Sequence, residues 1–340
     1  GLLAGLGTGA ASAGRAGAAA AATSATVPEP TVTTVARPTN AARNLPGVNR
    51  PPVHLGDMNT PEEFIIGQLY QLALQQQGYT VSLDRNISAP YLRIAGLRTG
   101  TLDLYPEYIG EWNSRVAHLH RRYRSLHAAY MAGAAYARRH GFRLLPPTPY
   151  SHTYCVAVLS QYAAANHLRS IPALARSAPI IFGAPKTFQD ISDGLRVLER
   201  GYHLRPGYVQ TILDTLQYWW LGSGNVQAAS CNTTDPQLAS PKFVELRDPR
   251  HVFGYGNVIP VTTARVLRAE GPAFTRTIER VDRLLTLRAV RGLNTELELG
   301  GHLPTNIAAQ FLQGNGILPP SRYAPVPGGG ATTGAGTAPS

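Results

Sequence analysis

The sequence predicts an α/β fold of two lobes, each with a mainly parallel sheet flanked by helices. Three observations support this fold class. The chain has 340 residues, which is enough for two ordinary domains. Strand-like segments alternate with helical segments from residue 53 to residue 320, and this alternation is typical of parallel sheets. Two irregular stretches, at 146–149 and 247–256, are the expected crossings between the lobes.

Both ends of the chain are predicted to be flexible segments. Residues 1–52 are rich in Ala, Gly, Thr and Pro and lack apolar periodicity, and residues 321–340 have a similar composition. The Ala-rich start is compatible with the end of a secretion signal, with the end of a membrane anchor or with a plain spacer. No run of about 18 or more apolar residues occurs, so no membrane span is predicted.

The first part of the body begins with a recognisable helix start. Thr60 is a capping residue, Pro61 suits the first helical position, the acids Glu62 and Glu63 suit the first turn, and Gly78 is expected to end the helix. Similar signals predict the segments that follow: a strand at 79–83, a short helix at 90–98, an extended segment at 101–105 and a long helix at 115–140.

The second part of the body opens on a continuous apolar run at 154–159, which predicts a buried strand. The further strands and helices are predicted from their periodicity and flanking residues. Strands are expected at 180–183, 226–231 and 256–261, and helices at 171–176, 191–201, 208–221, 262–290 and 304–314.

The net charge of +11 does not indicate nucleic-acid binding. Almost all of the positive charge is arginine, because lysine occurs only at Lys186 and Lys242, and it is spread over many segments. A nucleic-acid-binding surface typically concentrates its charge in a stripe with interleaved aromatic residues. The densest cluster, residues 118–124, falls within the predicted long helix, and we interpret it as a solvated basic face.

Sequence motifs for catalysis and cofactor binding are absent. The chain has no phosphate-binding loop, no GxSxG, no HExxH and no CxxC. His118, His120 and His127 lie close in sequence but have no acidic or cysteine partner nearby, so we expect no metal site there. We therefore predict a protein that is not an enzyme and that needs no cofactor.

Aromatic residues gather next to predicted turns, which is where an open α/β sheet binds its ligands. Tyr108 follows an extended segment, Tyr154 follows the proline-rich crossing, and Tyr255 precedes a strand. The faces of such rings can hold cations. Trp219 and Trp220 lie inside a predicted helix, so we interpret them as core residues instead.

The chain has two cysteines, Cys155 and Cys231. A sparse and even count is compatible with one disulfide in an oxidising compartment, and equally with two buried thiols. The spacing alone does not show whether the two residues meet.

Several ordered motifs give the body a resemblance to a known family. The most distinctive is GLRTGTLDLYPEYIG at 96–110, and others are LLPPTPYSHTYCVAV at 144–158 and LQYWWLGSGNVQAASCNTTD at 216–235. They are similar to motifs of the substrate-binding proteins of osmoprotectant (glycine betaine, choline and carnitine) ABC transporters. The resemblance runs from about 57 to 318.

The resemblance implies a two-lobed type II periplasmic-binding-protein fold with two interlobe crossings. Lobe I is expected to comprise 53–149 plus 252–320, and lobe II to comprise 150–251.

In that family an aromatic cage holds a quaternary ammonium group. The resemblance places Tyr108 and Tyr154 at two of the cage positions. Asn232 stands where the family has an aromatic residue, and Gly256, next to Tyr255, stands where it has a tyrosine. The resemblance therefore implies a solute site that keeps half of the cage.

The family also holds the solute's carboxylate, by an arginine and other polar groups. The arginine position is Ile191 here, and a threonine position in the turn after YPEY is Glu111, which suggests a cationic or hydroxylated ligand instead. The resemblance also places Cys155 and Cys231 on strands of one lobe, each beside a cleft position, which favours a disulfide between them.

The resemblance implies an extracytoplasmic solute-binding component of an ABC importer, periplasmic or at the cell surface. Such a protein captures a small solute, by family a quaternary-amine osmoprotectant, in the interlobe cleft and delivers it to a membrane permease. The replaced cage positions leave an alternative open: a ligand-sensing or permease-fused receptor of the same fold for a non-betaine solute, for example a phenolic metabolite. We expect a monomer without a nucleic-acid partner.

Overall fold

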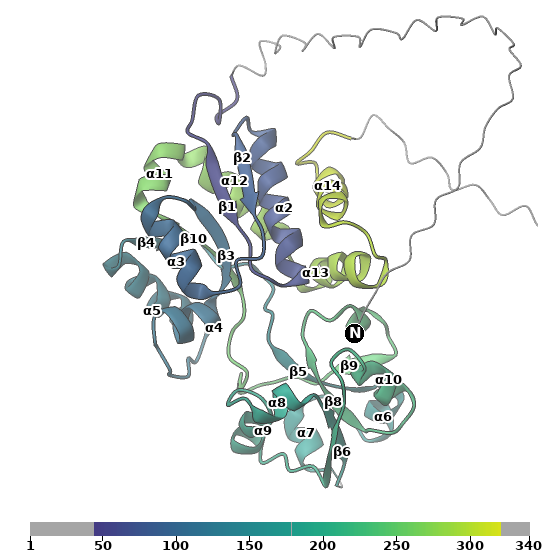
Figure 1. The fold of residues 1–340 in the computed structure, drawn as a ribbon. Helices are drawn as coiled ribbons and strands as arrows, with labels where there is room; N and C mark the ends of the chain where they lie inside the picture. The colour runs from purple at the N-terminus through teal and green to yellow at the C-terminus, as the bar shows by residue number, and fades with distance from the viewer. Residues whose placement is uncertain (1–43, 178, 321–340) are drawn as a thin grey trace, which may run out of the picture. The chain divides into compact units, whose positions relative to one another are not determined.

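The computed structural model describes residues 44–177 and 179–320 (Figure 1). Most of the predicted N-terminal segment and all of the predicted C-terminal tail lie outside the described residues. The predicted α/β fold is confirmed, because the described chain forms two five-stranded sheets flanked by helices. None of the helices in these two ranges has the length and apolar character needed to cross a membrane.

The first sheet has the strand order β2-β1-β3-β10-β4. Strand β1 pairs in parallel with β2 and β3, whereas β10 pairs antiparallel with β3 and β4. The strands are β1 Val53–Gly56, β2 Val81–Asp84, β3 Leu104–Tyr108, β4 Phe142–Leu144 and β10 Val258–Thr263.

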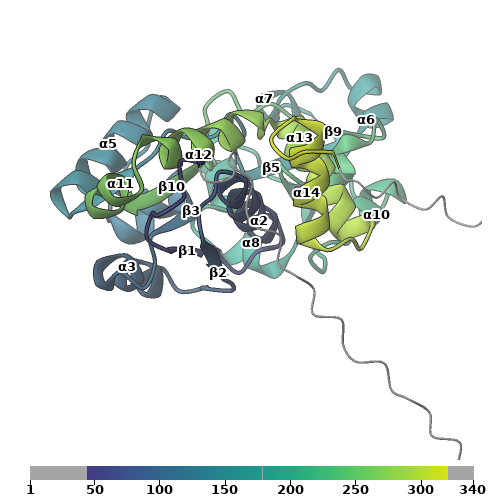
Figure 2. The ribbon, with the colours of Figure 1, turned by 90° about the horizontal axis from the view of Figure 1, so that it is seen from above.

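Helices cover both faces of this sheet, and Figure 2 shows α2 and α14 running next to each other on one of them. Side chains alternate along β3, so Leu104 joins the core under α2, α12 and α14, and Tyr105 joins the core under α3 and α5. The helices are α2 Pro61–Gln76, α3 Pro90–Thr99, α4 Ile109–Glu111, α5 Leu126–Arg139, α11 Ala264–Glu270, α12 Pro272–Leu284, α13 Leu287–Asn294 and α14 Pro304–Gly314, with π-helical turns η1 Trp112–Val116 and η3 Thr295–Leu299.

The second sheet has the order β7-β6-β8-β5-β9. Strand β6 pairs in parallel with β7 and β8, whereas β5 pairs antiparallel with β8 and β9. The strands are β5 Tyr154–Leu159, β6 Ile181–Ala184, β7 Tyr208–Thr211, β8 Ala228–Asn232 and β9 Phe243–Glu245.

The second sheet also has a core on each face. In β5, Val156 faces the core under α7, α8 and α9, whereas Cys155 and Ala157 face the core under α10. The surrounding helices are α6 Ser160–Ala165, α7 Ile171–Ala175, α8 Lys186–Asp190, α9 Leu195–Tyr202 and α10 Gln217–Gly222, with a 3₁₀ turn η2 Pro236–Ala239.

Both sheets are mixed, whereas the sequence predicted mainly parallel sheets. The antiparallel pairs arise where a strand enters a sheet from the other one. Strand β10 begins where β3 ends, so Val258 faces Tyr108, and β5 begins where β8 ends, so Tyr154 faces Asn232.

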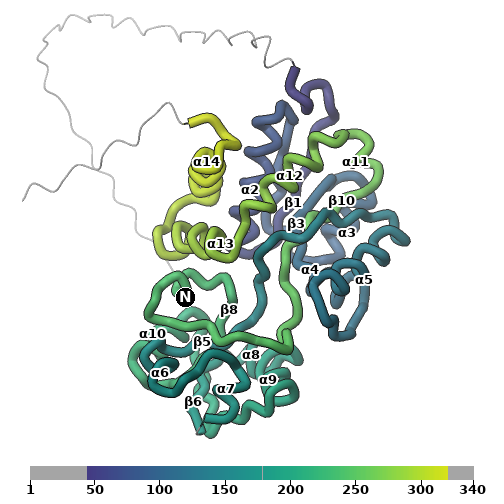
Figure 3. Tube along the Cα trace, turned by 180° about the vertical axis from the view of Figure 1, so that it is seen from behind, coloured from purple at the N-terminus to yellow at the C-terminus, as the bar shows by residue number. Residues whose placement is uncertain are grey.

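Two connections join the sheets, from β4 to β5 and from β9 to β10, as Figure 3 shows. They hydrogen-bond to each other, because the backbone N–H of His152 donates to the carbonyl of Gly256, and Gly256 N–H donates to the hydroxyl of Ser151, both at 2.9 Å. A Cβ atom at position 256 would lie only 1.7 Å from the His152 carbonyl oxygen. Only glycine therefore fits at position 256, where the two connections approach each other closely.

Two of the predicted helices are wrong in part. The helix expected at 115–140 begins only at Leu126, because Ser125 caps it by accepting a hydrogen bond from the N–H of Ala128 at 3.1 Å. The basic cluster at 118–124 is therefore exposed loop rather than helix. The helix expected at 208–221 is strand β7 followed by the shorter α10, because the edge of the second sheet takes up residues 208–211.

Candidate functional site

Tyr108 lies at the end of β3, at the edge of the first sheet where β10 begins. Its side chain is buried, and its hydroxyl donates a hydrogen bond to Oε1 of Glu62 at 2.9 Å. Its ring stacks on the imidazole of His152, with the ring centroids 5.1 Å apart. The orientation of Tyr108 is therefore fixed both at its hydroxyl and on one face of its ring.

Tyr154 and Asn232 lie opposite each other at the corresponding edge of the second sheet. Both are half-buried. The ring of Tyr154 contacts Phe188 edge-on at 5.0 Å between centroids, and Phe253 at 6.3 Å. Tyr154 is thus supported by two aromatic rings that belong to the same hydrophobic cluster, and it retains exposed surface.

Acidic side chains act on the hydroxyl of Tyr154. Burial raises the pKa of Tyr154, and the carboxylates of Asp214, Glu111 and Asp193 raise it further, while Arg115 acts in the opposite direction. Asp193 and Asp214 lie in loops that follow helix α8 and strand β7 of the second sheet, whereas Glu111 follows β3 of the first sheet. Acids that surround an aromatic ring in this way favour a cationic ligand over an anionic one.

Glu111, predicted as a ligand-binding residue, has a half-exposed side chain that is paired with Arg115. Its Oε2 lies 2.5 Å from Nε of Arg115, one helical turn further on, and the two side chains are 44% and 64% exposed. Ion pairs of such exposure contribute little stability. The pair therefore does not prevent Glu111 from taking another partner.

Tyr255 and Ile191, the two remaining predicted site residues, do not join this group. Tyr255 stacks on His251 within the second connection, at 5.0 Å between centroids. Ile191 ends α8 and is half-buried. Among the described residues, no hydrogen bond, ring contact or ion pair links either of them to Tyr108 or Tyr154.

The structure also reveals a cluster that the sequence analysis missed, which we name the Glu62 junction. The carboxylate of Glu62, at the second position of α2, is buried at its centre. Its partners come from β3, from the first connection, from the turn after β8 and from α13. The junction consists of Glu62, Tyr108, Tyr150, His152, Thr234 and Asn294.

Glu62 and His152 favour each other's charged forms in this cluster. Burial acts to raise the pKa of Glu62, but the positive charge of His152 and hydrogen bonds from His152 and Tyr150 lower it to about 2. Burial likewise acts to lower the pKa of His152, but the charge of Glu62 outweighs it and raises that pKa above its ordinary value. An ion pair thus lies at the centre of the junction.

Glu63, the next residue of α2, behaves in the opposite way. Burial raises the pKa of Glu63 well above its usual range, and the charges of Glu62, Glu107 and Asp57 raise it further. Neither of its carboxyl oxygens has a hydrogen-bond partner among the described residues. The pKa values of these two adjacent acids are therefore shifted in opposite directions, because Glu62 faces His152 and accepts hydroxyl donors, whereas Glu63 has no hydrogen-bond donor among the described residues.

Helix α13 provides a further link between the first and the second sheet. Arg291 donates from Nε to the carbonyl oxygen of Thr233 at 2.8 Å, and its Nη2 lies 2.5 Å from Oε2 of Glu245 in β9. Asn294, one turn later, donates from Nδ2 to the carbonyl oxygen of Thr234 at 3.0 Å. The end of β8 is thus held by α13 as well as by the connections.

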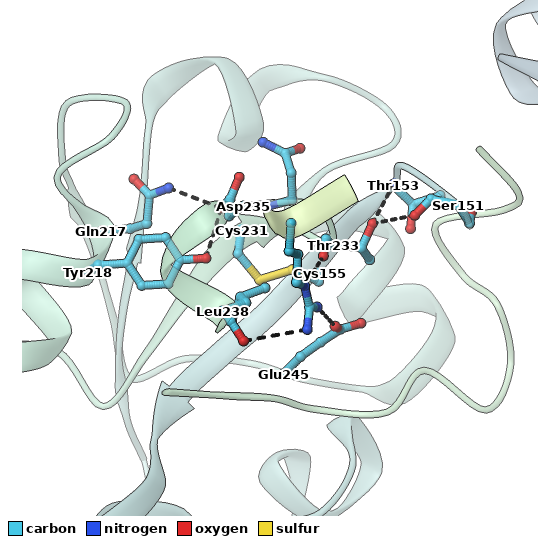
Figure 4. The surroundings of a disulfide bond; sticks show 12 residues. Ser151, Thr153, Cys155, Gln217, Tyr218, Cys231, Thr233, Asp235, Leu238 and Glu245 are labelled. Atoms are coloured by element: carbon cyan, nitrogen blue, oxygen red, sulfur yellow. Dashed lines mark hydrogen bonds and ion pairs between the residues drawn. A yellow bond between two sulfur atoms is a disulfide. The ribbon is translucent and has the colours of Figure 1, made fainter. Parts of the chain in front are cut away.

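A disulfide joins Cys155 and Cys231 immediately beside the pair Tyr154 and Asn232 (Figure 4). Both cysteines are buried on the α10 side of the sheet. The same figure shows Asp235, which accepts hydrogen bonds from the hydroxyl of Tyr218 at 2.8 Å and from the N–H of Asn232 at 3.0 Å. The strand end that carries Asn232 is therefore fixed covalently and by hydrogen bonds.

Over the described ranges 44–177 and 179–320, no group of three or more His, Cys, Asp or Glu side chains is arranged to hold a metal ion. The candidate residues supply aromatic rings and carboxylates, which are chemically suited to hold an organic cation. They include an oriented ring at the end of β3 and a supported ring at the start of β5.

Known proteins resemble this chain along most of its length. A family model described as the substrate binding domain of ABC-type glycine betaine transport systems matches residues 51–314. The glycine-betaine-binding protein of Pseudomonas aeruginosa is 23% identical over 278 residues, which are 78% of this chain and 88% of that protein. The glycine betaine-binding protein YehZ of Escherichia coli is 25% identical over 290 residues, 81% of this chain and 94% of that protein.

The fold has solved counterparts as well. The crystal structure of a glycine betaine/carnitine/choline ABC transporter protein superimposes with a TM-score of 0.72 at 20% identity, covering 78% of this chain and 99% of that one. At that identity the likeness concerns the fold alone. The family model, which spans well over half of the sequence, carries the assignment: the chain belongs to the family of substrate-binding domains of ABC-type glycine betaine transport systems.

Proposed function

We propose that this protein acts outside the cytoplasm as a monomeric solute receptor, which delivers a small organic cation to a membrane permease and does no chemistry on it. Membership of the transport family supports the receptor role. The absence of catalytic motifs from the sequence is consistent with it.

We propose further that the solute carries a quaternary ammonium group and no carboxylate, as choline does. The observation that carries this proposal is the negative surroundings of Tyr154, where Asp214, Glu111 and Asp193 all raise the pKa of its hydroxyl. A carboxylate there would be repelled, and Ile191 stands where the family resemblance expects an arginine. An aromatic ring that contacts a cation contributes about 0.5–2 kcal/mol, and carboxylates nearby add to that attraction.

The proposed site lies between two lobes that close on the solute. The lobe boundaries proposed from the sequence are 53–149 plus 252–320 and 150–251. The strands of the first sheet fall within the first set of residues and those of the second sheet within the second. The two connections between the sheets suit a hinge, since closure of such a fold is a rotation of lobes about a few connecting residues.

Choline and glycine betaine make a matched pair for testing this function. They share the trimethylammonium group and differ in carrying a hydroxyl or a carboxylate. We expect choline to bind with at least about tenfold higher affinity by calorimetry, and to raise the free energy of unfolding by about 2.7 kcal/mol at 100 times its dissociation constant. Tighter binding of glycine betaine would overturn the choice of solute, and a lack of binding by every quaternary amine would overturn the function.

A further inference from the structure

The carboxylate of Glu62 is fully occupied by side chains of the protein itself. Its Oε1 accepts the hydroxyls of Tyr108 and Tyr150, at 2.9 and 2.8 Å. Its Oε2 accepts Nδ2 of Asn294 at 3.2 Å and lies 3.5 Å from Nδ1 of His152. A carboxylate with this many donors, and with its side chain buried, does not serve as a solute contact. Any effect of Glu62 on solute binding therefore acts through the side chains that hydrogen-bond to its carboxylate.

The Glu62 junction reaches the second sheet through Thr234. Nδ1 of His152 lies 2.7 Å from the hydroxyl of Thr234, and Asn294 donates to the Thr234 carbonyl oxygen at 3.0 Å. Thr234 lies two residues after Asn232, the last residue of β8. The junction therefore connects the ring of Tyr108 at one sheet edge to the strand end beside Tyr154 at the other.

We propose, on the basis of the function proposed above, that Glu62 is a positioning residue of the solute site: it orients Tyr108 and couples that ring to the Thr234 turn through His152. Solute affinity then depends on the negative charge of Glu62 and on the protonation of His152, although neither group touches the solute. Loss of either charge loosens the connection between the two aromatic rings.

The groups that face His152 determine the direction of the pH dependence. They are Glu62 from α2, Asp235 from the turn after β8 and Glu298 from η3, together with the stacked ring of Tyr108. These three carboxylates outweigh the effect of burial, so the pKa of His152 lies above its ordinary value. The protonated form of His152 is therefore favoured more than in a free imidazole, and affinity is expected to fall as the pH rises through that raised pKa.

The variant Glu62→Gln tests this proposal, because the amide preserves the shape of the side chain and removes its charge. One readout is the pKa of His152, followed by NMR through the C2 proton of its ring. The other is the affinity for choline, measured by calorimetry between about pH 6 and about pH 9. We expect the pKa of His152 to fall, the affinity near neutral pH to weaken by about tenfold, and its pH dependence to flatten.

Glu298→Gln is the matched control, since Glu298 also faces His152 but makes no contact with Tyr108 among the described residues. It removes the same charge, and we expect choline affinity within about twofold of the wild type. If Glu62→Gln does not fold, Tyr108→Phe removes the same hydrogen bond with the ring retained, and we expect the same tenfold loss.

Two results would overturn the proposal. One is a Glu62→Gln protein that folds and binds choline with the wild-type affinity and pH dependence. The other is an unchanged pKa of His152 in that variant. The NMR titration needs no solute, so it still decides the coupling if the wild-type protein binds no quaternary amine, a result that counts against the proposed function instead.

Discussion

Cys155 and Cys231 face each other as a register pair of the antiparallel strands β5 and β8, and a disulfide joins them. The next pair along the ladder is Tyr154 and Asn232, at the edge of the sheet where the first connection arrives. The covalent bond thus holds the two strand ends of the proposed solute site in register.

Removal of this disulfide is expected to lower stability. The bond closes a loop with a sequence separation of 76, and cross-links of such length restrict the unfolded chain strongly. We expect the double variant Cys155→Ser/Cys231→Ser to lose about 3–4 kcal/mol in free energy of unfolding by chemical denaturation. Reduced wild-type protein should show the same loss. Two titratable thiols in the unreduced, denatured protein would contradict the bond itself.

Arg291 and Glu245 are expected to be energetically coupled. They link α13 to β9 at 2.5 Å, and their side chains are only 16% and 29% exposed. A double-mutant cycle with Arg291→Gln and Glu245→Gln should give a coupling energy of about 1–2 kcal/mol, because the pair is shielded from solvent.

The pair Arg283 and Glu279 provides the control for that cycle. It lies within α12 at 3.8 Å, and Arg283 is 67% exposed. We expect its coupling energy to stay below about 0.5 kcal/mol. Equal coupling energies in the two cycles would show that α13 does not hold the second sheet through Arg291.

Asp282 is expected to make the protein less stable as the pH rises. It lies on the buried face of α12, accepts a hydrogen bond from Tyr70 at 2.5 Å, and has its pKa raised to about 8, mainly by burial. The folded state therefore prefers the protonated acid. The stability that this preference contributes is complete below the unfolded pKa of about 3.9 and is lost as the pH rises towards the folded pKa.

The measurement for Asp282 compares the wild type with Asp282→Asn by chemical denaturation at several pH values. We expect the difference in free energy of unfolding to change by about 1.4 kcal/mol per pH unit between about pH 5 and about pH 7, in the direction that disfavours the wild type. A flat difference for Asp282→Asn would refute the buried protonated acid.

Gly256 and Gly292 are expected to respond in opposite directions to alanine. A Cβ at 256 would lie 1.7 Å from the carbonyl oxygen of His152, so Gly256→Ala must push the two connections apart. We expect it to cost more than about 2 kcal/mol in free energy of unfolding. Gly292 lies within α13, where a Cβ meets nothing within 4 Å. Gly292→Ala should stabilise the protein by about 0.5–1 kcal/mol, and a loss there would count against this account.

Local signals in the sequence predicted most elements of the fold. Pro61 and the acids after it predicted the start of α2, and the apolar run at 154–159 coincides with β5. The helix expected at 115–140 was wrong at its start, because residues 118–124 form an exposed loop and Ser125 caps the helix only after them. A mainly parallel arrangement failed for another reason. The direction of β5 and β10 depends on which sheet the preceding segment belongs to, and no local pattern contains that information.

Part of the candidate site, like part of the fold, could be predicted from the sequence, and part could not. Tyr108 and Tyr154 were found because motifs that surround them resemble a known family. Glu62 was interpreted only as an acid in the first turn of a helix, because the helix dipole favours negative charge there. Its contacts with Tyr150 and Asn294 span 88 and 232 positions, so only the folded chain brings them together.

Gly256 also bears on how the solute preference of this protein can change. The carbonyl oxygen of His152 fills the space that any side chain at this position would need. An aromatic residue cannot be introduced at position 256 by a single substitution, because the two connecting segments would first have to separate. An evolving lineage, or an engineer who wishes to rebuild the full cage, must therefore redesign the hinge together with the pocket.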